Sequence, residues 1–383
     1  DSWFSSMQQE FDSPTGYKNK NHCSFSGFLI HNIMIPYIKS YIKSFKYIKG
    51  LFQFDEKKIN EIQFVDEFYK GLNGEDTELR IFYAKKSIAQ SIIIFPGASP
   101  YAENHPGMIM LANALRNAGH HVFLPRIPNL KNLILVKDNV KWFSHCYKEL
   151  LQHKKINQTS PMVAGLSYGG ANLLRASLDK NMQNPAPLSI LSYGTYYSID
   201  TALDFFISGK ISFNNKTYNI NPHEWGPIVM FYNFFKSIEA DHDQETITQL
   251  LQFRIQDKHD EVDQTLSTLN DKDKKIVKNI LSGTIDEYLK TLIEKMLDAN
   301  KDLLEYLSPN HWAEKIQSKV FILHGANDSM VPFTESTRLS ETIPNNELLI
   351  SFLYEHREIS TDRGIFFKLK ELIKMINYFS YYF

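Results

Sequence analysis

The stretch that decides the fold is a glycine-rich segment, Val163-Ala164-Gly165-Leu166-Ser167-Tyr168-Gly169-Gly170. Its first residues are apolar and predict a buried strand, and the residues after Gly170 have the spacing of a helix. Between them stands a serine in the pattern Gly-x-Ser-x-Gly. Glycines beside the serine let the backbone pass close by in a strained strand-to-helix turn, which leaves the hydroxyl exposed. A glycine-rich turn without chemistry is the plainer alternative, and the flanking strand and helix argue against it.

Strands and helices alternate on both sides of this segment, up to about residue 198 and again after residue 310. Short apolar runs closed by glycine or proline predict strands that are buried on both faces. Such alternation indicates the α/β class, with a mostly parallel central sheet and helices on both faces. The expected strands are 78–84, 91–95, 121–124, 161–164, 188–193, 319–323 and 348–353, and the expected helices are 108–118, 136–151 and those beginning after residue 170 and near residues 333 and 361.

The alternation is interrupted at residues 199–310 by charged, helical sequence, which we interpret as an insertion. Its clearest element starts with a capping box formed by Thr284 and Glu287. We therefore expect three parts: an N-terminal extension (1–60), an α/β core (61–198 and 311–383) and the helical insertion (199–310).

The composition is that of a folded globular protein: of 383 residues, 43% are hydrophobic and 22% are charged. A net charge of −1 gives no general support for nucleic-acid binding, and no nucleic-acid partner is expected. Cys23 and Cys146 match no disulfide scaffold, zinc site or redox motif. No apolar run reaches about 18 residues, so no transmembrane helix is expected, and the cytoplasm is slightly favoured among undetermined compartments. The chain starts at Asp1 and not at methionine, which leaves open whether a leader was removed.

A second informative segment places Asp328 just after the buried strand that ends in His324-Gly325. Ligand-facing residues of open α/β sheets lie at the carboxyl ends of strands. A carboxylate there can accept the Nδ1 proton of a histidine, and the alternative is a turn or helix-capping residue. If serine, acid and histidine follow one another in that order, His356 is the one histidine left after Asp328. It too follows an expected strand, although a surface histidine among charged neighbours is the plainer interpretation.

These segments resemble the α/β-hydrolase family over roughly residues 61–198 and 311–383. The resemblance is carried by Gly165-Leu166-Ser167-Tyr168-Gly169, by His324-Gly325 followed by Asp328, Val331 and Pro332, and by His356 beyond the last strand. It implies that Ser167 is a nucleophile, that His356 is a general base and then acid, and that Asp328 orients the histidine.

The resemblance also implies an oxyanion hole made of two backbone N–H groups. One is expected from Tyr168, the residue after the nucleophile. The other should come from the loop Pro96-Gly97-Ala98-Ser99-Pro100, where many relatives carry His-Gly and this chain has Pro96-Gly97. That departure leaves Ala98 and Ser99 as candidates, of which we favour Ala98. No cofactor and no metal are predicted: Asp241-His242-Asp243 is better explained as solvated surface than as a ligand trio, and no phosphate loop is present.

The expected activity is hydrolysis of a carboxylic ester through an acyl-enzyme, by a capped serine esterase without a cofactor. A thioesterase, a peptidase or an acyltransferase would use the same triad, and a catalytically silent binding protein is the alternative from another class. The resemblance implies that the insertion forms a cap over the site. Aromatic residues in its first part suit an apolar or lipid-like ester, although most of these rings are expected in the core of the cap.

Residues 37–52 contain no acid and place Lys39, Lys43 and Lys46 opposite an aromatic face. A basic amphipathic helix is the pattern of a peripheral membrane contact. The ordinary alternative is a helix whose aromatic face, with Phe45 and Ile48, packs on the core, and we expect this second arrangement.

Overall fold

The computed structural model describes residues 27–86, 89–156, 159–213, 216–353 and 364–383. The chain divides into two compact units, residues 1–39 and 40–383, and helix α2 (Gly27–Phe52) crosses the boundary between them. In these described ranges no helix is long and apolar enough to cross a lipid bilayer. All strands described below lie in the second unit.

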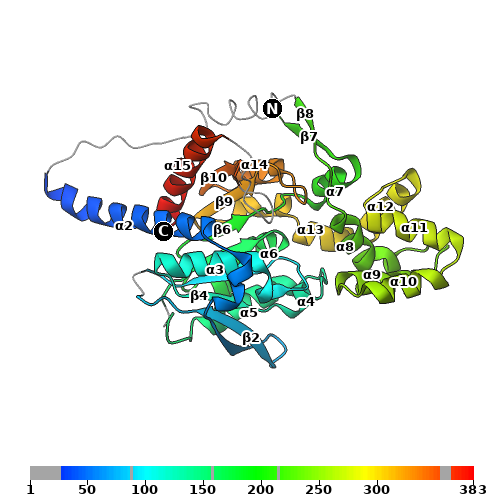
Figure 1. Cartoon of the computed structure of the whole chain (residues 1–383), viewed down its shortest axis with the longest axis horizontal. Helices are drawn as coiled ribbons and strands as arrows, with labels where there is room; N and C mark the ends of the chain where they lie inside the picture. The colour runs from blue at the N-terminus through cyan, green and yellow to red at the C-terminus, as the bar shows by residue number, and fades with distance from the viewer. Residues whose placement is uncertain (1–26, 87–88, 157–158, 214–215, 354–363) are drawn as a thin grey trace. The chain divides into compact units, whose positions relative to one another are not determined.

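A sheet of eight strands forms the centre of this unit, in the order β1-β2-β4-β3-β5-β6-β9-β10 (Figure 1). Strand β2 pairs antiparallel with β1 and β4, and the other neighbouring strands are parallel. The mostly parallel sheet predicted from the sequence is therefore confirmed. The strands are β1 (Val65–Lys70), β2 (Asp76–Phe82), β3 (Ile92–Phe95), β4 (Val122–Pro125), β5 (Met162–Leu166), β6 (Ile190–Tyr193), β9 (Val320–Gly325) and β10 (Asn346–Ser351).

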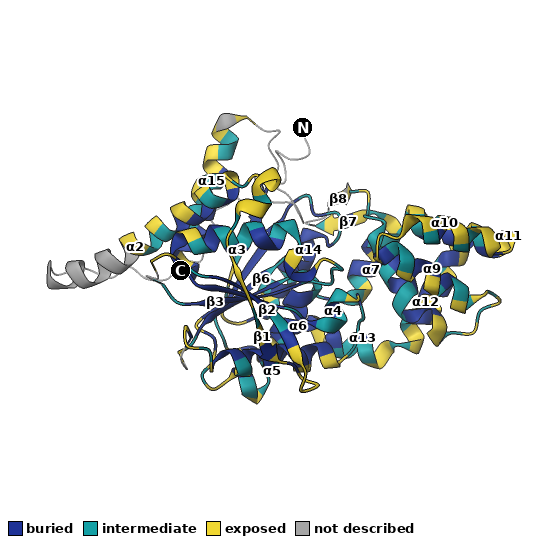
Figure 2. Ribbon diagram, turned by 60° about the horizontal axis from the view of Figure 1, so that its bottom comes forward, coloured by how far each residue is buried: buried dark blue, intermediate teal, exposed yellow. Residues whose placement is uncertain are grey.

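Helices cover both faces of the sheet, so the same strand contributes to two hydrophobic cores. In β3, Ile93 and Phe95 belong to one core and Ile92 and Ile94 to the other. Figure 2 shows the resulting buried centre. The first core includes residues of α5 (Asp138–Leu150), α6 (Tyr168–Ala176) and α14 (Phe333–Thr342), and the second includes residues of α2, α3 (Pro106–Ala118) and α15 (Ile365–Tyr382).

The chain between β6 and β9 forms a helical insert, defined here as residues 199–307. Its core is separate from those of the sheet and contains Phe231, Phe234 and Phe235, so these rings serve the insert's own packing. The buried carboxylate of Glu335 fixes the entry to the insert, because its Oε2 accepts the N–H groups of Tyr197 and Ser198, each at 2.9 Å. The elements are α7 (Ile199–Ser208), β7 (Lys210–Phe213), β8 (Lys216–Asn219), α8 (Trp225–Phe234), α9 (Gln244–Ile255), α10 (His259–Thr268), α11 (Asp271–Ser282), α12 (Glu287–Ala299) and α13 (Lys301–Leu307).

Shorter helices occupy several connections. These are η2 (Glu56–Glu61), η3 (Ala102–Asn104), α4 (Pro128–Lys131), η4 (Lys180–Met182), η5 (Phe235–Ser237), η6 (Pro309–His311) and η7 (Ala313–Lys315).

The amphipathic segment packs on the core and buries Ile48 as expected, but Phe45 and Phe52 of the expected aromatic face are exposed. Tyr47, Ile48 and Leu51 are buried, whereas Phe45 is 56% exposed and Phe52 is 47% exposed. Gly50 explains the choice of face, because a Cβ there would lie 3.0 Å from the Cα of Ala114 in α3. Helix α2 lies close to α3 at Gly50, which has no side chain, and in this orientation Phe45 faces solvent.

Two details of the insert also differ from expectation. Helix α12 begins at Glu287 and its N-cap is Asp286, whose side chain accepts the N–H of Leu289; the capping box of Thr284 and Glu287 is therefore wrong. The side chain of His242, expected at a solvated surface, is 1% exposed and lies 2.5 Å from Asp273 Oδ1.

Candidate active site

Ser167 occupies the turn between β5 and α6 in the left-handed region of backbone space, with φ 52° and ψ −127°. This conformation is strained for a residue with a side chain. Two backbone hydrogen bonds hold it: the Ser167 N–H donates to the Tyr193 carbonyl at 2.7 Å, and the Gly170 N–H donates to the Ser167 carbonyl at 2.8 Å. The Thr195 hydroxyl also donates to the Ser167 carbonyl, at 3.3 Å. Ser167 lines a cavity. The structure thus gives Ser167 the strained turn that its spacing predicts.

The glycines around Ser167 are required by close backbone contacts. A Cβ on Gly169 would lie 2.0 Å from the carbonyl oxygen of Pro96, and a Cβ on Gly165 would lie 2.8 Å from the carbonyl oxygen of Gly169. Gly97 meets the turn from the other side, since its Cβ would lie 3.3 Å from the Cβ of Ser167. The loop after β3 is therefore pressed against the serine turn.

The backbone N–H groups beside Ser167 differ in their availability. Tyr168 is the first residue of α6, where an N–H has no partner within the helix. The Ser99 N–H donates to the Leu130 carbonyl at 3.1 Å and is therefore occupied. Ala98 makes no backbone hydrogen bond within the described chain. Of the two candidates for the second donor, the structure thus leaves Ala98 with the available N–H.

Asp328 lies at the carboxyl end of β9 and is 1% exposed. Its Oδ1 accepts the N–H groups of Met330 at 2.8 Å and of Val331 at 2.9 Å. Its Oδ2 lies 3.5 Å from Nε2 of His324, and that ring nitrogen is 2.9 Å from the Val331 carbonyl. One oxygen of Asp328 therefore holds its own loop in place, while the other lies beside a buried histidine that the sequence motif already contained.

His356 lies outside the described residues, so its distance from Ser167 and Asp328 stays a prediction. His105 is a histidine that sequence reasoning did not select. It caps α3, accepting the Gly107 N–H on Nδ1 at 3.1 Å, and it lines the same cavity as Ser167. A histidine just before the proline at a helix start is the signal that points to this capping position.

The cavity beside Ser167 has a volume of about 130 Å³. Its walls come from the loop after β3, from α3, from the ends of β5 and β6 and from Met330 beside Asp328. A smaller inner cavity of about 20 Å³ lies between the sheet and helices α2, α3 and α15. Both cavities are lined by Leu111, Leu166 and Tyr193. The site is thus an apolar pocket with one strained serine at its wall.

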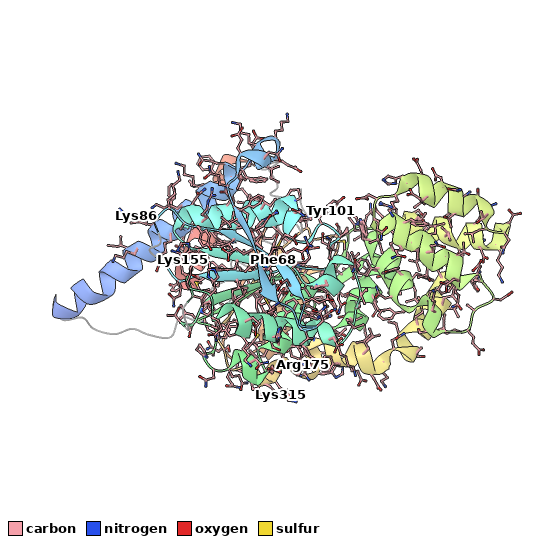
Figure 3. The ribbon with its side chains drawn as sticks, turned by 90° about the horizontal axis from the view of Figure 1, so that it is seen from below. Phe68, Lys86, Tyr101, Lys155, Arg175 and Lys315 are labelled. Atoms are coloured by element: carbon pink, nitrogen blue, oxygen red, sulfur yellow. The ribbon has the colours of Figure 1, made fainter. Side chains whose placement is uncertain are left out.

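The helical insert meets the core close to this pocket but lines none of its described wall. Tyr101 donates its hydroxyl to Asp257 of the insert, and Figure 3 shows Tyr101 on the side of the core that faces the insert helices. The His223 N–H donates to the Ser329 carbonyl, next to Asp328, at 3.0 Å. The insert therefore contacts both loops that carry the site.

No metal or redox centre is evident in the described part of the chain. No group of three or more His, Cys, Asp or Glu residues there could hold a metal ion. Cys146 is buried, and burial raises the pKa of its thiol far above the usual range, which makes it unreactive.

No family model and no curated protein matches the chain. Among solved structures it is similar to a 2,6-dihydroxy-pseudo-oxynicotine hydrolase, with 12% identity and a TM-score of 0.46 over 84% of this chain and 68% of that one. It is similar to an esterase from Exiguobacterium antarcticum, with 13% identity and a TM-score of 0.42 over 82% and 99%. A third is an α/β hydrolase superfamily protein from Enterococcus faecalis, with 13% identity and a TM-score of 0.43 over 84% and 98%.

The fold is that of the α/β-hydrolases. Similarities at this level of identity say nothing about activity. The fold is assigned from the strands and helices of this chain. A mostly parallel sheet is covered on both faces, and β5 leads through Gly165-Leu166-Ser167-Tyr168-Gly169 into α6. Asp328 follows β9 at the same edge of the sheet. The chain therefore has this fold, and its function has to be inferred from the residues of the site.

Proposed function

We propose that this chain is a serine hydrolase that cleaves carboxylic esters through an acyl-enzyme. The supporting observation is Ser167, held at φ 52° on the wall of an apolar cavity, with the N–H groups of Tyr168 and Ala98 beside it. A strained, cavity-lining serine next to available N–H donors is the arrangement that acyl transfer needs.

In the proposed reaction, Ser167 Oγ attacks the carbonyl carbon of the ester and passes its proton to His356. The carbonyl oxygen becomes an oxyanion and accepts hydrogen bonds from the Tyr168 and Ala98 N–H groups. Collapse of this intermediate breaks the bond to the alcohol oxygen, which leaves with the proton from His356. A water molecule then repeats the sequence on the acyl-enzyme, and the carboxylic acid leaves. Asp328 holds the histidine and stabilises its charged form.

The cavity wall supports an apolar ester as the proposed substrate. Methionine, leucine and tyrosine side chains make up much of it, namely Met108, Met110, Leu111, Leu166, Tyr193 and Met330. An ester with an apolar acyl or alcohol part fits such a wall better than a charged one. A thioester or amide substrate would use the same groups, and comparison of matched ester, thioester and amide substrates separates these activities.

The decisive experiment is labelling of the intact protein with a fluorophosphonate, alongside hydrolysis of an activated ester. We expect stoichiometric labelling at Ser167 and loss of both labelling and turnover in Ser167→Ala, with an unchanged circular dichroism spectrum. Turnover of Ser167→Ala near the parent rate would remove Ser167 from the mechanism. A parent protein that neither labels nor turns over any activated ester would support the silent binding protein instead.

A further inference from the structure

The outward face of α2 between Ser40 and Phe52 is apolar and basic. Ile42 is 48% exposed, Phe45 is 56% exposed and Phe52 is 47% exposed. Lys46 and Lys49 are exposed on the same face, since they lie one helical turn from Ile42 and Phe45. The helix packs on the core with its opposite side. Packing therefore does not explain why apolar residues occupy this outward face.

Helix α15 adjoins α2 and shows the same character. Phe366 is 87% exposed, Leu369 is 52% exposed and Ile373 is 51% exposed, at spacings that place them along one side. The two helices are joined by a hydrogen bond of 3.1 Å between Tyr41 Oη and Asn377 Oδ1. We call these outward residues of α2 and α15 the α2–α15 face.

Charge on the α2–α15 face is of one sign. Residues 40–52 contain Lys43, Lys46 and Lys49 and no aspartate or glutamate. The one acid of α15, Glu371, is fully buried and lies 3.1 Å from Lys374, so it leaves the exposed surface basic. Exposed apolar side chains grouped with lysines mark a binding surface more often than a plain water-facing helix.

We propose that the α2–α15 face docks on an anionic lipid bilayer. Lysines at the rim would lie among the headgroups, and Phe45, Ile42 and Leu369 would enter the boundary with the acyl chains. A second copy of the chain fits this face poorly, because a two-fold contact would bring the lysines of both copies into one interface without an exposed acid of the face to pair with them. The proposal depends on this surface alone and holds whether or not Ser167 is catalytic.

The first test distinguishes membrane contact from packing by replacing, one at a time, two residues of α2, the exposed Phe45 and the buried Ile48. The full chain is sedimented with vesicles of phosphatidylcholine and phosphatidylserine, and with vesicles of phosphatidylcholine alone. We expect binding to the mixed vesicles, about tenfold weaker in Phe45→Ser with an unchanged melting temperature. Ile48, which is 2% exposed, is the matched control: Ile48→Ser should lower the melting temperature and leave vesicle binding by the folded protein in place.

The second test concerns charge. Replacing Lys46 and Lys49 together with glutamine should weaken binding to the mixed vesicles roughly 25-fold, since each lysine near an anionic surface contributes about fivefold. Lys275 and Lys278 of α11 are also exposed and three residues apart, so their replacement with glutamine is a control with the same charge change. That control should bind like the parent.

Three results would overturn the proposal. One is failure of the parent to sediment with mixed vesicles at low salt. Another is equal binding by the parent, Phe45→Ser and the double glutamine variant. The third is concentration-dependent dimerisation that Phe45→Ser abolishes in the absence of lipid, which would assign the face to a second copy. Neither Phe45 nor the lysines lie at the Ser167 cavity, so ester hydrolysis in solution should be unchanged in all variants.

Discussion

At the scale of single residues, Asp328 is the proposed site residue whose surroundings are described most completely. Its Oδ1 holds the loop through two N–H groups, and an asparagine oxygen can accept the same two bonds. We therefore expect Asp328→Asn to fold normally but to disturb the tautomer of the partner histidine. The turnover number on an activated ester should fall by a factor approaching ~10⁴.

Steady-state kinetics with a melting curve checks this expectation. A large loss of turnover with a retained melting temperature supports the orienting role of Asp328. An unaffected rate would contradict it and direct attention to Asp200, which is exposed in the first turn of α7.

A second residue, His120, is expected to make the free energy of unfolding depend on pH. Its Nδ1 lies 2.7 Å from the Gln90 carbonyl, and burial lowers its pKa from 6.5 to about 4. The unfolded chain binds a proton near the ordinary pKa, whereas the folded protein resists it until the pH approaches 4. The contribution of His120 to the free energy of unfolding is therefore fully present above the pKa of the unfolded chain. About 3 kcal/mol of it is lost as the pH falls from 6.5 towards 4.

Thermal unfolding of the parent and of His120→Asn at a series of pH values measures this contribution. The asparagine amide can donate to the Gln90 carbonyl without titrating, so the melting temperature of the variant should decline less below pH 6.5. His121 and His153 also have lowered pKa values and are present in both proteins, so the difference between the curves reports His120. Parallel curves would contradict the assignment.

Ser167 and Asp328 could be proposed from the sequence because the backbone geometry around a site requires particular residue types at fixed positions. A serine at φ 52° needs glycines where the chain passes close, and those glycines can be read directly. The preference for Ala98 over Ser99 could not be secured from the sequence, because it depends on a hydrogen bond from the Ser99 N–H to the Leu130 carbonyl in α4. His105 was missed for a similar reason: its place at the cavity follows from the tertiary position of α3.

At the scale of elements, buried apolar strands were predictable from the sequence, and a mostly exposed edge strand was not. Strand β1 was not expected, since Tyr69 is its one buried residue and the other side chains are at least partly exposed. Its position at the sheet edge comes from pairing with β2 and not from its own hydrophobicity. The face by which α2 packs was also unpredictable, because tyrosine, phenylalanine and leucine on adjoining faces are nearly equal in apolar area.

The insert contains a polar cluster, with His242 and Asp273 buried and Tyr288 partly exposed, that links three of its helices. Asp273 of α11 lies 2.5 Å from Nδ1 of His242, just before α9, and His242 Nε2 lies 2.7 Å from Tyr288 Oη in α12. Removing the carboxylate leaves buried donors without an acceptor, so Asp273→Ala should destabilise the insert by about 3 kcal/mol. Asp271→Ala, at an exposed position of the same first turn, is the control.

Hydrogen exchange localises this effect. Amides of α9, α11 and α12 should exchange faster in Asp273→Ala, whereas β3 and β5 should keep the parent rates, because the insert has a hydrophobic core of its own. Equal acceleration in the sheet would show that the insert and the core unfold together.

At the scale of the whole molecule, the pocket gathers parts that are distant in sequence. The loop after β3, helix α3, the ends of β5 and β6 and Met330 meet around Ser167, because parallel strands bring their carboxyl ends to one edge. The insert contacts this edge through Tyr101 and Ser329 without lining the described wall. The sequence predicted the shared edge from strand order, but the inner cavity under α2 and α15 required the three-dimensional packing.

This inner cavity predicts how the proposed enzyme selects its acyl chain. Leu111 lines both cavities, so we expect an acyl chain that extends from Ser167 towards the inner cavity to contact it. Filling the space at this position with an indole should leave room for an acetyl group and exclude a hexanoyl group. We expect Leu111→Trp to lower the ratio of kcat/KM for hexanoyl over acetyl esters about tenfold or more, because a pocket discriminates each methylene by about 1–3 kcal/mol. Leu188→Trp, at a residue that is 58% exposed before β6, is the control and should keep the parent ratio. An equal loss on both esters, or an unchanged ratio, would show that the acyl chain leaves Ser167 by another route.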